Sequence, residues 1–279
     1  MCPVASVRMG PHSSDVDRPP ALFVPHGDGY IPTDLSRGPW SPDALHGGPV
    51  AALLTRAVEQ QATDDGLQLA RVTVELLRPV PMAPLTVATS LVRPGRKVQL
   101  VDVVAESGDV EVAWARALRI RRRDDDPPVA PTVPEDRPPP PMEEGVTTAS
   151  EVDGYRAFHN QGMDIRFVKG RFDTLGPATA WFRLRCPVVA GEDPSPWQRA
   201  VAAADFGNGI AAELSFGSHV FINPDLTVSL YRPPVGEWVC LDARTRFGTS
   251  GIGGAESALW DADGRIGSAT QSLLVEAVR

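Results

Sequence analysis

The feature that most constrains the fold is an internal repeat with a fixed offset of 154 residues. The paired positions lie at a helix start, in a strand, at a turn and in a final strand: Ser41-Pro42 with Ser195-Pro196, residues 72–80 with 226–234, Asp109 with Asp263, and Ala115 with Ala269. One offset relates all of these elements in the same order. We therefore interpret the chain as two fused copies of one unit.

Each copy is expected to contain a helix followed by antiparallel strands. In the first copy, Ser41-Pro42 is a helix-start signal, apolar residues recur at helical spacing after Pro49, and the helix should stop near 64–66. Alternating or turn-bounded segments predict strands at 70–80, 84–109, 110–123, 155–189, 226–234, 237–248, 253–264 and 265–278, with one or two short strands within 21–40. This pattern predicts an α+β fold with a helix packed on a sheet.

The domain boundaries follow from composition. Residues 1–20 are expected to form a flexible tail, and residues 123–146 are acidic and rich in proline. Proline removes backbone donors, so we interpret 123–146 as a stiff linker without a helix or central strand. The two repeat units then span 21–122 and 147–279, and we expect the second to carry the catalytic residues.

Charge and composition exclude several functions. The chain has 279 residues and a net charge of −8, which argues against nucleic acid as the main partner. The sequence has no apolar run near the roughly 20 residues that span a bilayer, and its start lacks a secretory apolar region. Cys2, Cys186 and Cys240 are far apart in the sequence. We therefore expect a cytoplasmic protein with no cysteine-built metal site and no cofactor.

Three polar residues in the second copy lie next to apolar residues that we expect to form the hydrophobic core. Gln271 shares a strand face with Ala269 and Leu273, and a buried amide costs free energy unless it is bonded. Asp205 ends an alanine-rich helical run, and Asn223 precedes a proline. Each has a structural alternative: a glutamine bonded to backbone, a carboxylate that caps a helix end, and a turn residue.

The first copy supplies a comparison for these three positions. The offset of 154 places Ala51, Leu69 and Ala117 at the positions of Asp205, Asn223 and Gln271. A residue that the fold itself needs would tend to occur in both copies. The difference favours a single site, formed by the second copy.

The chain resembles the double hot-dog acyl-CoA thioesterases of the type II group. The motifs that carry the resemblance are HGGPVAALL, VTVELLRPVPMAPL and VRPGRKVQLVDV in the first half, and AADFGNGI, FINPDLTVSLYRPPVGEW and DGRIGSATQSLLVE in the second. The resemblance implies two fused hot-dogs, hydrolysis of acyl-CoA in lipid metabolism, and a homodimer or higher homo-oligomer. It also implies a water held by an acid, a hydroxyl or amide residue, and a glutamine. These fall on Asp205, Asn223 and Gln271, with Thr227 as the fallback for the middle position.

The mechanism that we expect is direct attack of water on the thioester carbon. Asp205 deprotonates or polarises the water, while Asn223 and Gln271 orient it. The oxyanion needs backbone donors, and the N-terminus of the first helix is a natural source. His46, Gly47 and Gly48 precede or open that helix, so we assign them to substrate binding, with His46 as a capping or packing residue.

Two other functions fit the same sequence. A hot-dog hydratase or dehydratase would need an Asp/His or Glu/His pair, for which His219 is the nearest candidate in the sequence. A non-catalytic acyl-thioester binder would fit the replacement of the usual threonine by Asn223. Turnover of any acyl-CoA separates the enzymes from the binder, and release of free thiol separates hydrolysis from hydration.

Overall fold

The structure of the chain, a computed structural model, describes residues 21–62, 66–123, 137–147 and 155–278. The predicted tail (1–20) and most of the predicted linker lie outside these residues, whereas the first helix ends at Gln60, a few residues before the predicted stop near 64–66. Within the described residues, none of the helices combines the length and the apolar character needed to cross a membrane.

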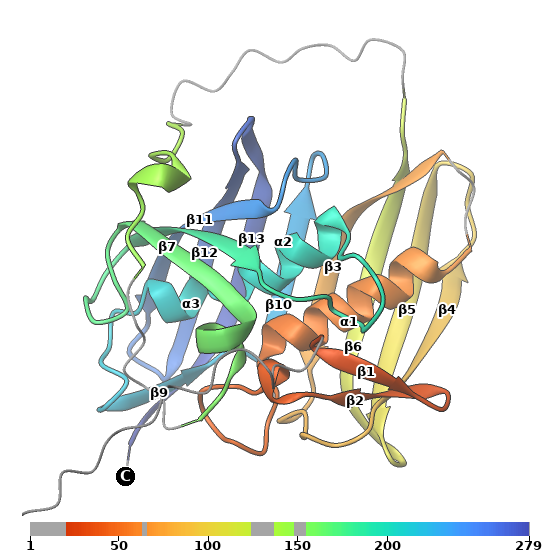
Figure 1. Ribbon diagram of the computed structural model, residues 1–279, viewed down its shortest axis with the longest axis horizontal. Coiled ribbons are helices and arrows are strands. Elements are labelled where there is room, and N and C mark those ends of the chain that lie inside the picture. Colours follow the sequence, from red (N-terminus) through yellow and green to blue (C-terminus); the bar gives the residue numbers. More distant parts are fainter. Residues whose placement is uncertain (1–20, 63–65, 124–136, 148–154, 279) are drawn as a thin grey trace, which may run out of the picture.

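The described residues form a large antiparallel sheet with the strand order β4-β5-β6-β3-β10-β13-β12-β11-β8-β7, and β9 pairs with β13 beside this path (Figure 1). The strands of the first half are β3 (Leu67–Leu76), β4 (Thr86–Arg93), β5 (Val98–Ser107) and β6 (Val110–Arg121). Those of the second half are β7 (Met163–Lys169), β8 (Ala178–Leu184), β9 (His219–Ile222), β10 (Asp225–Leu230), β11 (Trp238–Phe247), β12 (Ile252–Asp261) and β13 (Gly264–Ala277). Every predicted strand region contains a strand, whereas β9 was not predicted because four residues give little alternation.

Helices cover one face of this sheet. Helix α1 (Gly47–Gln60) contacts strands β3 to β6, and α2 (Pro196–Ala204) contacts β8, β10 and β11. A short helix α3 (Gly207–Ile210) follows α2 directly. The two longer helices lie side by side in front of the sheet (Figure 1). This arrangement confirms the predicted α+β fold with a helix packed on a sheet in each half.

Smaller elements connect the two halves. A hairpin of β1 (Phe23–His26) and β2 (Gly29–Pro32) leads into the 3-10 turn η1 (Asp34–Ser36), as the prediction of one or two short strands requires. The backbone N–H of Phe23 donates to the carbonyl of Val188 at 2.9 Å, so the first segment is bonded to the second half. The π-helical turn η3 (Phe158–Gly162) then precedes β7.

The two copies meet at equivalent positions in the middle of the sheet. Strands β3 and β10 pair antiparallel, with Thr73 opposite Thr227. The two hydroxyl oxygens are 3.1 Å apart, and their residues are separated by 154 positions. This separation equals the repeat offset, so an approximate two-fold axis passes between the two threonines. The internal repeat is therefore visible in the strand register.

The offset also holds for an irregularity inside these strands. In the first copy, the register of β3 against β6 shifts between Leu69 and Arg71. In the second copy, the corresponding strand is broken at Asn223-Pro224 into β9 and β10, which both pair with β13. Proline has no N–H for the sheet, which favours a complete break where the first copy has a bulge. This break places Asn223 between β9 and β10, outside both strands.

The helices do not follow the offset, and the predicted helix start at Ser41-Pro42 is wrong. Helix α1 begins at Gly47 with His46 as its N-cap, whereas α2 begins at Pro196 with Ser195 as its N-cap. The residues just before α1 are extended because their backbone groups bond elsewhere. Leu45 N–H donates to Val80 at 2.8 Å, and His46 N–H donates to Ser36 at 2.9 Å. Ala51 is therefore not the structural counterpart of Asp205.

The described end of the predicted linker is bound to the second half. Residues Met142–Glu144 form a short 3-10 helix, η2, which corrects the prediction that the segment holds no helix. Its N-cap is Pro141, and a proline at a helix start loses no helical hydrogen bond. The indole Nε1 of Trp181 donates to the carbonyl of Pro140 at 2.9 Å, and Val146 bridges to Phe167. The division of the chain at residues 122 and 147 stays a proposal.

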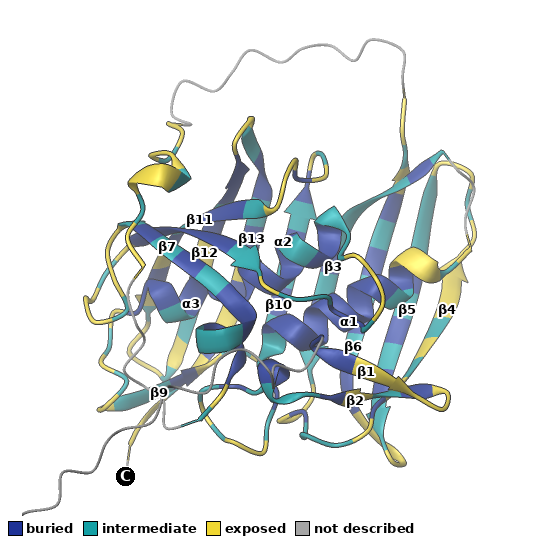
Figure 2. Cartoon of the chain, in the orientation of Figure 1, coloured by how far each residue is buried: buried dark blue, intermediate teal, exposed yellow. Residues whose placement is uncertain are grey.

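The core lies between the helices and the inner face of the sheet, as the burial colours of Figure 2 show. Leu54 of α1 is fully buried there, whereas Leu77, just after β3, is 49% exposed. We predict that Leu54→Ala lowers the free energy of unfolding by about 2–5 kcal/mol, because it leaves a cavity under α1. Leu77→Ala is the matched control and should change it by less than about 0.5 kcal/mol. Urea unfolding measures both, and equal effects would contradict this account of the core.

Candidate active site

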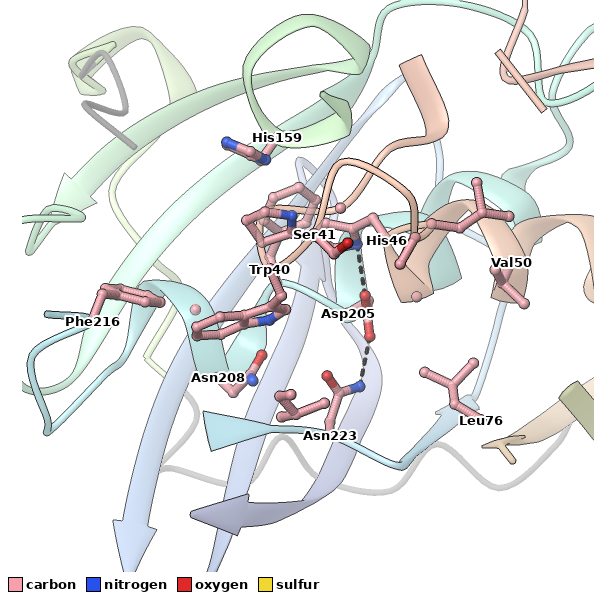
Figure 3. A pocket seen from close by; sticks show the side chains of 18 of the residues that line it. Trp40, Ser41, His46, Val50, Leu76, His159, Asp205, Asn208, Phe216 and Asn223 are labelled. Carbon is pink, nitrogen blue, oxygen red and sulfur yellow. Dashed lines mark hydrogen bonds and ion pairs between the residues drawn. The ribbon is translucent and has the colours of Figure 1, made fainter. Parts of the chain in front are cut away.

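A cavity of about 1190 Å³ lies where the N-terminus of α1 meets the end of α2. Its apolar lining comes from both halves and includes Trp40, Leu76, Phe172, Phe216 and Leu274. The polar residues His46, Asp205, Asn208 and Asn223 line the same cavity, as Figure 3 shows. A large apolar cavity with a few convergent polar groups is the usual form of a small-molecule site.

Asp205 stands at the junction of the two helices. It is the C-cap of α2, and only 4% of its surface is exposed. Gly48 allows α1 to pack closely on α2, because a Cβ at this position would lie 2.7 Å from the carbonyl oxygen of Ala202. A Cβ at Gly47 would likewise lie 2.7 Å from Oδ2 of Asp205. The carboxylate therefore faces the first turn of α1, where the helix dipole favours negative charge.

Asn223 reaches Asp205 from the break between β9 and β10. Its Nδ2 donates to Oδ1 of Asp205 at 2.8 Å and to the carbonyl of Asp225 at 3.2 Å. The nitrogen must face the carboxylate, because two oxygens would repel each other. Within the described part of the chain, Oδ1 of Asn223 accepts no hydrogen bond. The amide oxygen therefore remains available to a donor in the cavity.

Gln271 approaches Asp205 from β13. Its Nε2 donates to the backbone carbonyl of Asp205 at 3.2 Å and to the carboxylate Oδ1 at 3.4 Å. Its Oε1 accepts from the backbone N–H of Asn208 at 3.1 Å. The residue is 5% exposed and is not part of the cavity lining. Both ends of the amide therefore bond to the α2–α3 junction, and Gln271 contacts Asp205 from the side that faces away from the cavity.

His46 brings the first half into the cluster. Its Nδ1 lies 2.8 Å from Oδ2 of Asp205 and 3.1 Å from the backbone nitrogen of Gly48. Figure 3 shows the resulting row of His46, Asp205 and Asn223. Among the three residues assigned to substrate binding, His46 and Gly47 line the cavity, whereas Gly48 does not. The contact between His46 and Asp205 was missed by sequence reasoning, since it joins distant segments through the helix packing.

The environment of Asp205 keeps it ionised. Burial favours the neutral acid and would raise its pKa. The hydrogen bond and charge of His46, the hydrogen bond from Asn223 and that from the N–H of Gly48 outweigh this effect and lower the pKa of Asp205 below its ordinary value. Asp205 is therefore a charged carboxylate in the folded protein at neutral pH.

Two residues considered from the sequence lie away from the cluster. Thr227 is bonded to Thr73, and its neighbours Leu226 and Val228 are the residues that point into the core. The fallback position therefore faces the opposite side of the sheet from Asp205. His219 lies on β9, pairs with Ser218 and does not line the cavity. The histidine beside Asp205 is His46, from the other half of the chain.

Comparison with known families agrees with this architecture. The model of the acyl-CoA thioesterase C-terminal domain matches residues 131–275, and that of the N-terminal domain matches residues 36–120. The chain belongs to the acyl-CoA thioesterase family and is a thioester hydrolase. Membership of this family argues against one of the two alternatives raised from the sequence, the non-catalytic acyl-thioester binder. None of the curated proteins matches the sequence.

Solved structures share the fold at low sequence identity. A putative thioesterase II from Thermobifida fusca has a TM-score of 0.71 at 19% identity, with 93% of this chain and 96% of that chain covered. A hot-dog protein of unknown function from Alicyclobacillus acidocaldarius has a TM-score of 0.71 at 17% identity, with coverage of 92% and 96%. The acyl-CoA thioesterase II TesB2 from Mycobacterium marinum has a TM-score of 0.65 at 14% identity, with coverage of 91% and 94%. The predicted double hot-dog fold is confirmed.

We predict that Gly47→Ala lowers kcat/KM roughly tenfold to a hundredfold, because the new methyl group would lie 2.7 Å and 2.8 Å from the two carboxylate oxygens of Asp205. Gly217→Ala is the control, since its Cβ would lie 3.7 Å from the nearest atom, Oγ of Ser215. Steady-state thiol release measures both variants. An unchanged rate in Gly47→Ala would show that the close contact between α1 and Asp205 is unimportant for the reaction.

Proposed function

We propose that the chain hydrolyses acyl-CoA to a carboxylic acid and CoA by direct attack of a water molecule held at the Asp205 cluster. The observation that supports this proposal is the convergence of Asp205, Asn223 and Gln271 at one end of a large apolar cavity. The negative charge of Asp205 polarises the water, and a fixed position next to the thioester carbon supplies the orientation that attack requires.

Asn223 supplies the contact that a hydroxyl residue would supply in related enzymes. Its nitrogen is used by Asp205, and its oxygen is available to accept a hydrogen bond from the water. A threonine hydroxyl has the same capacity to accept. The amide is therefore a chemically sufficient replacement at this position.

Gln271 acts through Asp205 and not on the water directly. Its hydrogen bonds fix both the carboxylate and the backbone that carries it. Such a buried group restricts the carboxylate to one orientation, and a fixed orientation is what positions the water. The sequence-based role for Gln271, contact with the water, is replaced here by a positioning role.

The substrate would lie with its thioester carbonyl near the first turn of α1. Gly47 lines the cavity there, and its backbone N–H is our candidate donor to the oxyanion. The aromatic and aliphatic lining of the cavity fits an acyl chain. Arg78 and Arg171 also line it and offer positive charge to the phosphates of CoA.

We predict that Asp205→Asn lowers kcat for thiol release from acyl-CoA about a hundredfold to ten-thousandfold, because the neutral amide no longer polarises the water. Asn223→Thr should retain most of the rate and Asn223→Leu should lose most of it, since only threonine accepts a hydrogen bond. Acyl-CoAs of increasing chain length, assayed by free-thiol release, give both the rate and the preferred chain.

The matched control for this series is Thr227→Val, which removes a hydroxyl from the face of the sheet opposite Asp205 and should leave the rate unchanged. Circular dichroism checks that each variant is folded. Equal turnover in wild type and Asp205→Asn would refute the role of Asp205. Loss of activity in Thr227→Val would favour the fallback assignment instead.

Hydration of an enoyl thioester is a second candidate activity. Such chemistry uses a paired acid and histidine, and His46 lies 2.8 Å from Asp205 in this cavity. The assay is loss of the enoyl absorbance of an enoyl-CoA without release of thiol. Thiol release alone, with the enoyl group intact in the product acid, would exclude this activity.

Homo-oligomer formation and a cytoplasmic location also remain proposals. Strand β4 ends the sheet and is largely exposed along its length, which leaves its edge available to a second copy of the chain.

A further inference from the structure

His46 is held more rigidly than a helix cap requires. Its ring packs against Phe158, with ring centroids 5.1 Å apart, and against Phe206, at 4.8 Å, and these two phenylalanine rings are themselves 5.6 Å apart. The side chain is 10% exposed, and it comes from the first half of the chain while its acidic partner comes from the second. A ring packed against two aromatic residues and bonded to the carboxylate is restricted in its orientation.

The contacts of Nδ1 determine the tautomer of this ring. One nitrogen cannot accept a hydrogen bond from Gly48 and also donate one to Asp205. Since Asp205 is ionised, the stable arrangement has the proton on Nδ1, pointed at Oδ2, with the N–H of Gly48 also directed at the carboxylate. When the ring is neutral, its lone pair is then on Nε2, and when Nε2 also binds a proton the resulting positive charge faces the carboxylate.

Nε2 has access to the substrate cavity. His46 lines that cavity, and no hydrogen bond to Nε2 from another described residue is present. Although Nε2 has no such partner, it is not a fully buried atom. A basic nitrogen therefore opens into the space in which the water and the thioester must meet.

Asp205 is a poor proton acceptor by comparison. Its Oδ2 faces Nδ1 of His46, and its Oδ1 accepts from Asn223 and Gln271. The same contacts lower its pKa, and a carboxylate stabilised in this way binds a proton weakly. The thiolate that leaves must gain a proton, which such a carboxylate would be slow to collect and return.

We propose that His46 is a catalytic residue, whose Nε2 accepts the proton of the attacking water and then returns it to the leaving sulfur. The water oxygen forms a bond to the thioester carbon as its proton moves to Nε2. The carbon–sulfur bond then breaks, and the imidazolium protonates the sulfur. The products are the free acid and CoA, and the imidazole is restored. Asp205 orients the ring and stabilises its charged form. This inference rests on the proposed hydrolysis.

Few other charges reach this ring. Asp205 is the acidic group in contact with it, and the aromatic residues packed on it carry no charge. The remaining titratable or charged residues that line the cavity are Arg78, His159, Arg171 and Asp173. The acid limb of the pH profile, in which the rate falls as the pH is lowered, should therefore report mainly on the His46–Asp205 pair.

The test is the pH dependence of thiol release by wild type and His46→Asn, with His219→Gln as a matched histidine control outside the cavity. Asparagine retains a helix cap and a hydrogen-bond donor near the position of Nδ1, but it has no group at Nε2. If His46 had only a structural role as helix cap and hydrogen-bond donor, the His46→Asn variant would keep its activity. His46→Gln, with an amide near the position of Nε2 and no basic nitrogen, is the second variant.

We expect kcat of wild type to show this acid limb, because a protonated His46 has no lone pair with which to accept the proton of the water. His46→Asn and His46→Gln should lower kcat about a hundredfold to ten-thousandfold at neutral pH and lose this limb, with KM little changed. His219→Gln should keep both rate and limb.

Three results would overturn the proposal. They are a wild-type kcat that does not fall at acid pH, a folded His46 variant with a kcat near wild type, and a folded variant that keeps the wild-type limb. The first of these can be decided even if neither variant folds. Each would leave hydrolysis at the Asp205 cluster intact, whereas no thiol release by wild type from any acyl-CoA would overturn the proposed function as well.

Discussion

The site depends on one buried negative charge, the carboxylate of Asp205. Burial makes an isolated carboxylate costly, so the folded protein must surround it with donors. These come from three separate segments: His46 at the start of α1, Asn223 at the break between β9 and β10, and Gln271 in β13. Because the first belongs to one half of the chain and the others to its repeat, the complete cluster requires both halves.

The two copies use the same helix arrangement for different purposes. At the site, the N-cap of α1, His46, faces the carboxylate that ends α2. At the opposite end of the helix pair, the N-cap of α2, Ser195, donates to the carboxylate of Glu59 in α1, as does Gln198. Glu59 does not line the described cavity. One end of the helix pair therefore forms the candidate site, and the other end forms a structural contact.

Much of the sheet could be predicted because side-chain alternation is a local signal and the repeat offset can be read directly from the sequence. The offset even relates Asn223 to Leu69 and Gln271 to Ala117 correctly, since the strand pairing preserves it. The relation of Asp205 to Ala51 failed because the helices start at different points in the two copies. The contact of His46 with Asp205 depends on that helix packing, and no spacing in the sequence encodes it.

The central claim is that His46 and Asp205 act as one unit, and a double-mutant cycle on kcat/KM tests it most directly. The corners are wild type, His46→Asn, Asp205→Asn and the variant with both changes, assayed with one acyl-CoA at neutral pH. If the two residues act together, the double variant should be about as slow as the slower single variant, because the second change removes nothing further. Fold losses that multiply in the double variant would show independent roles and contradict the account.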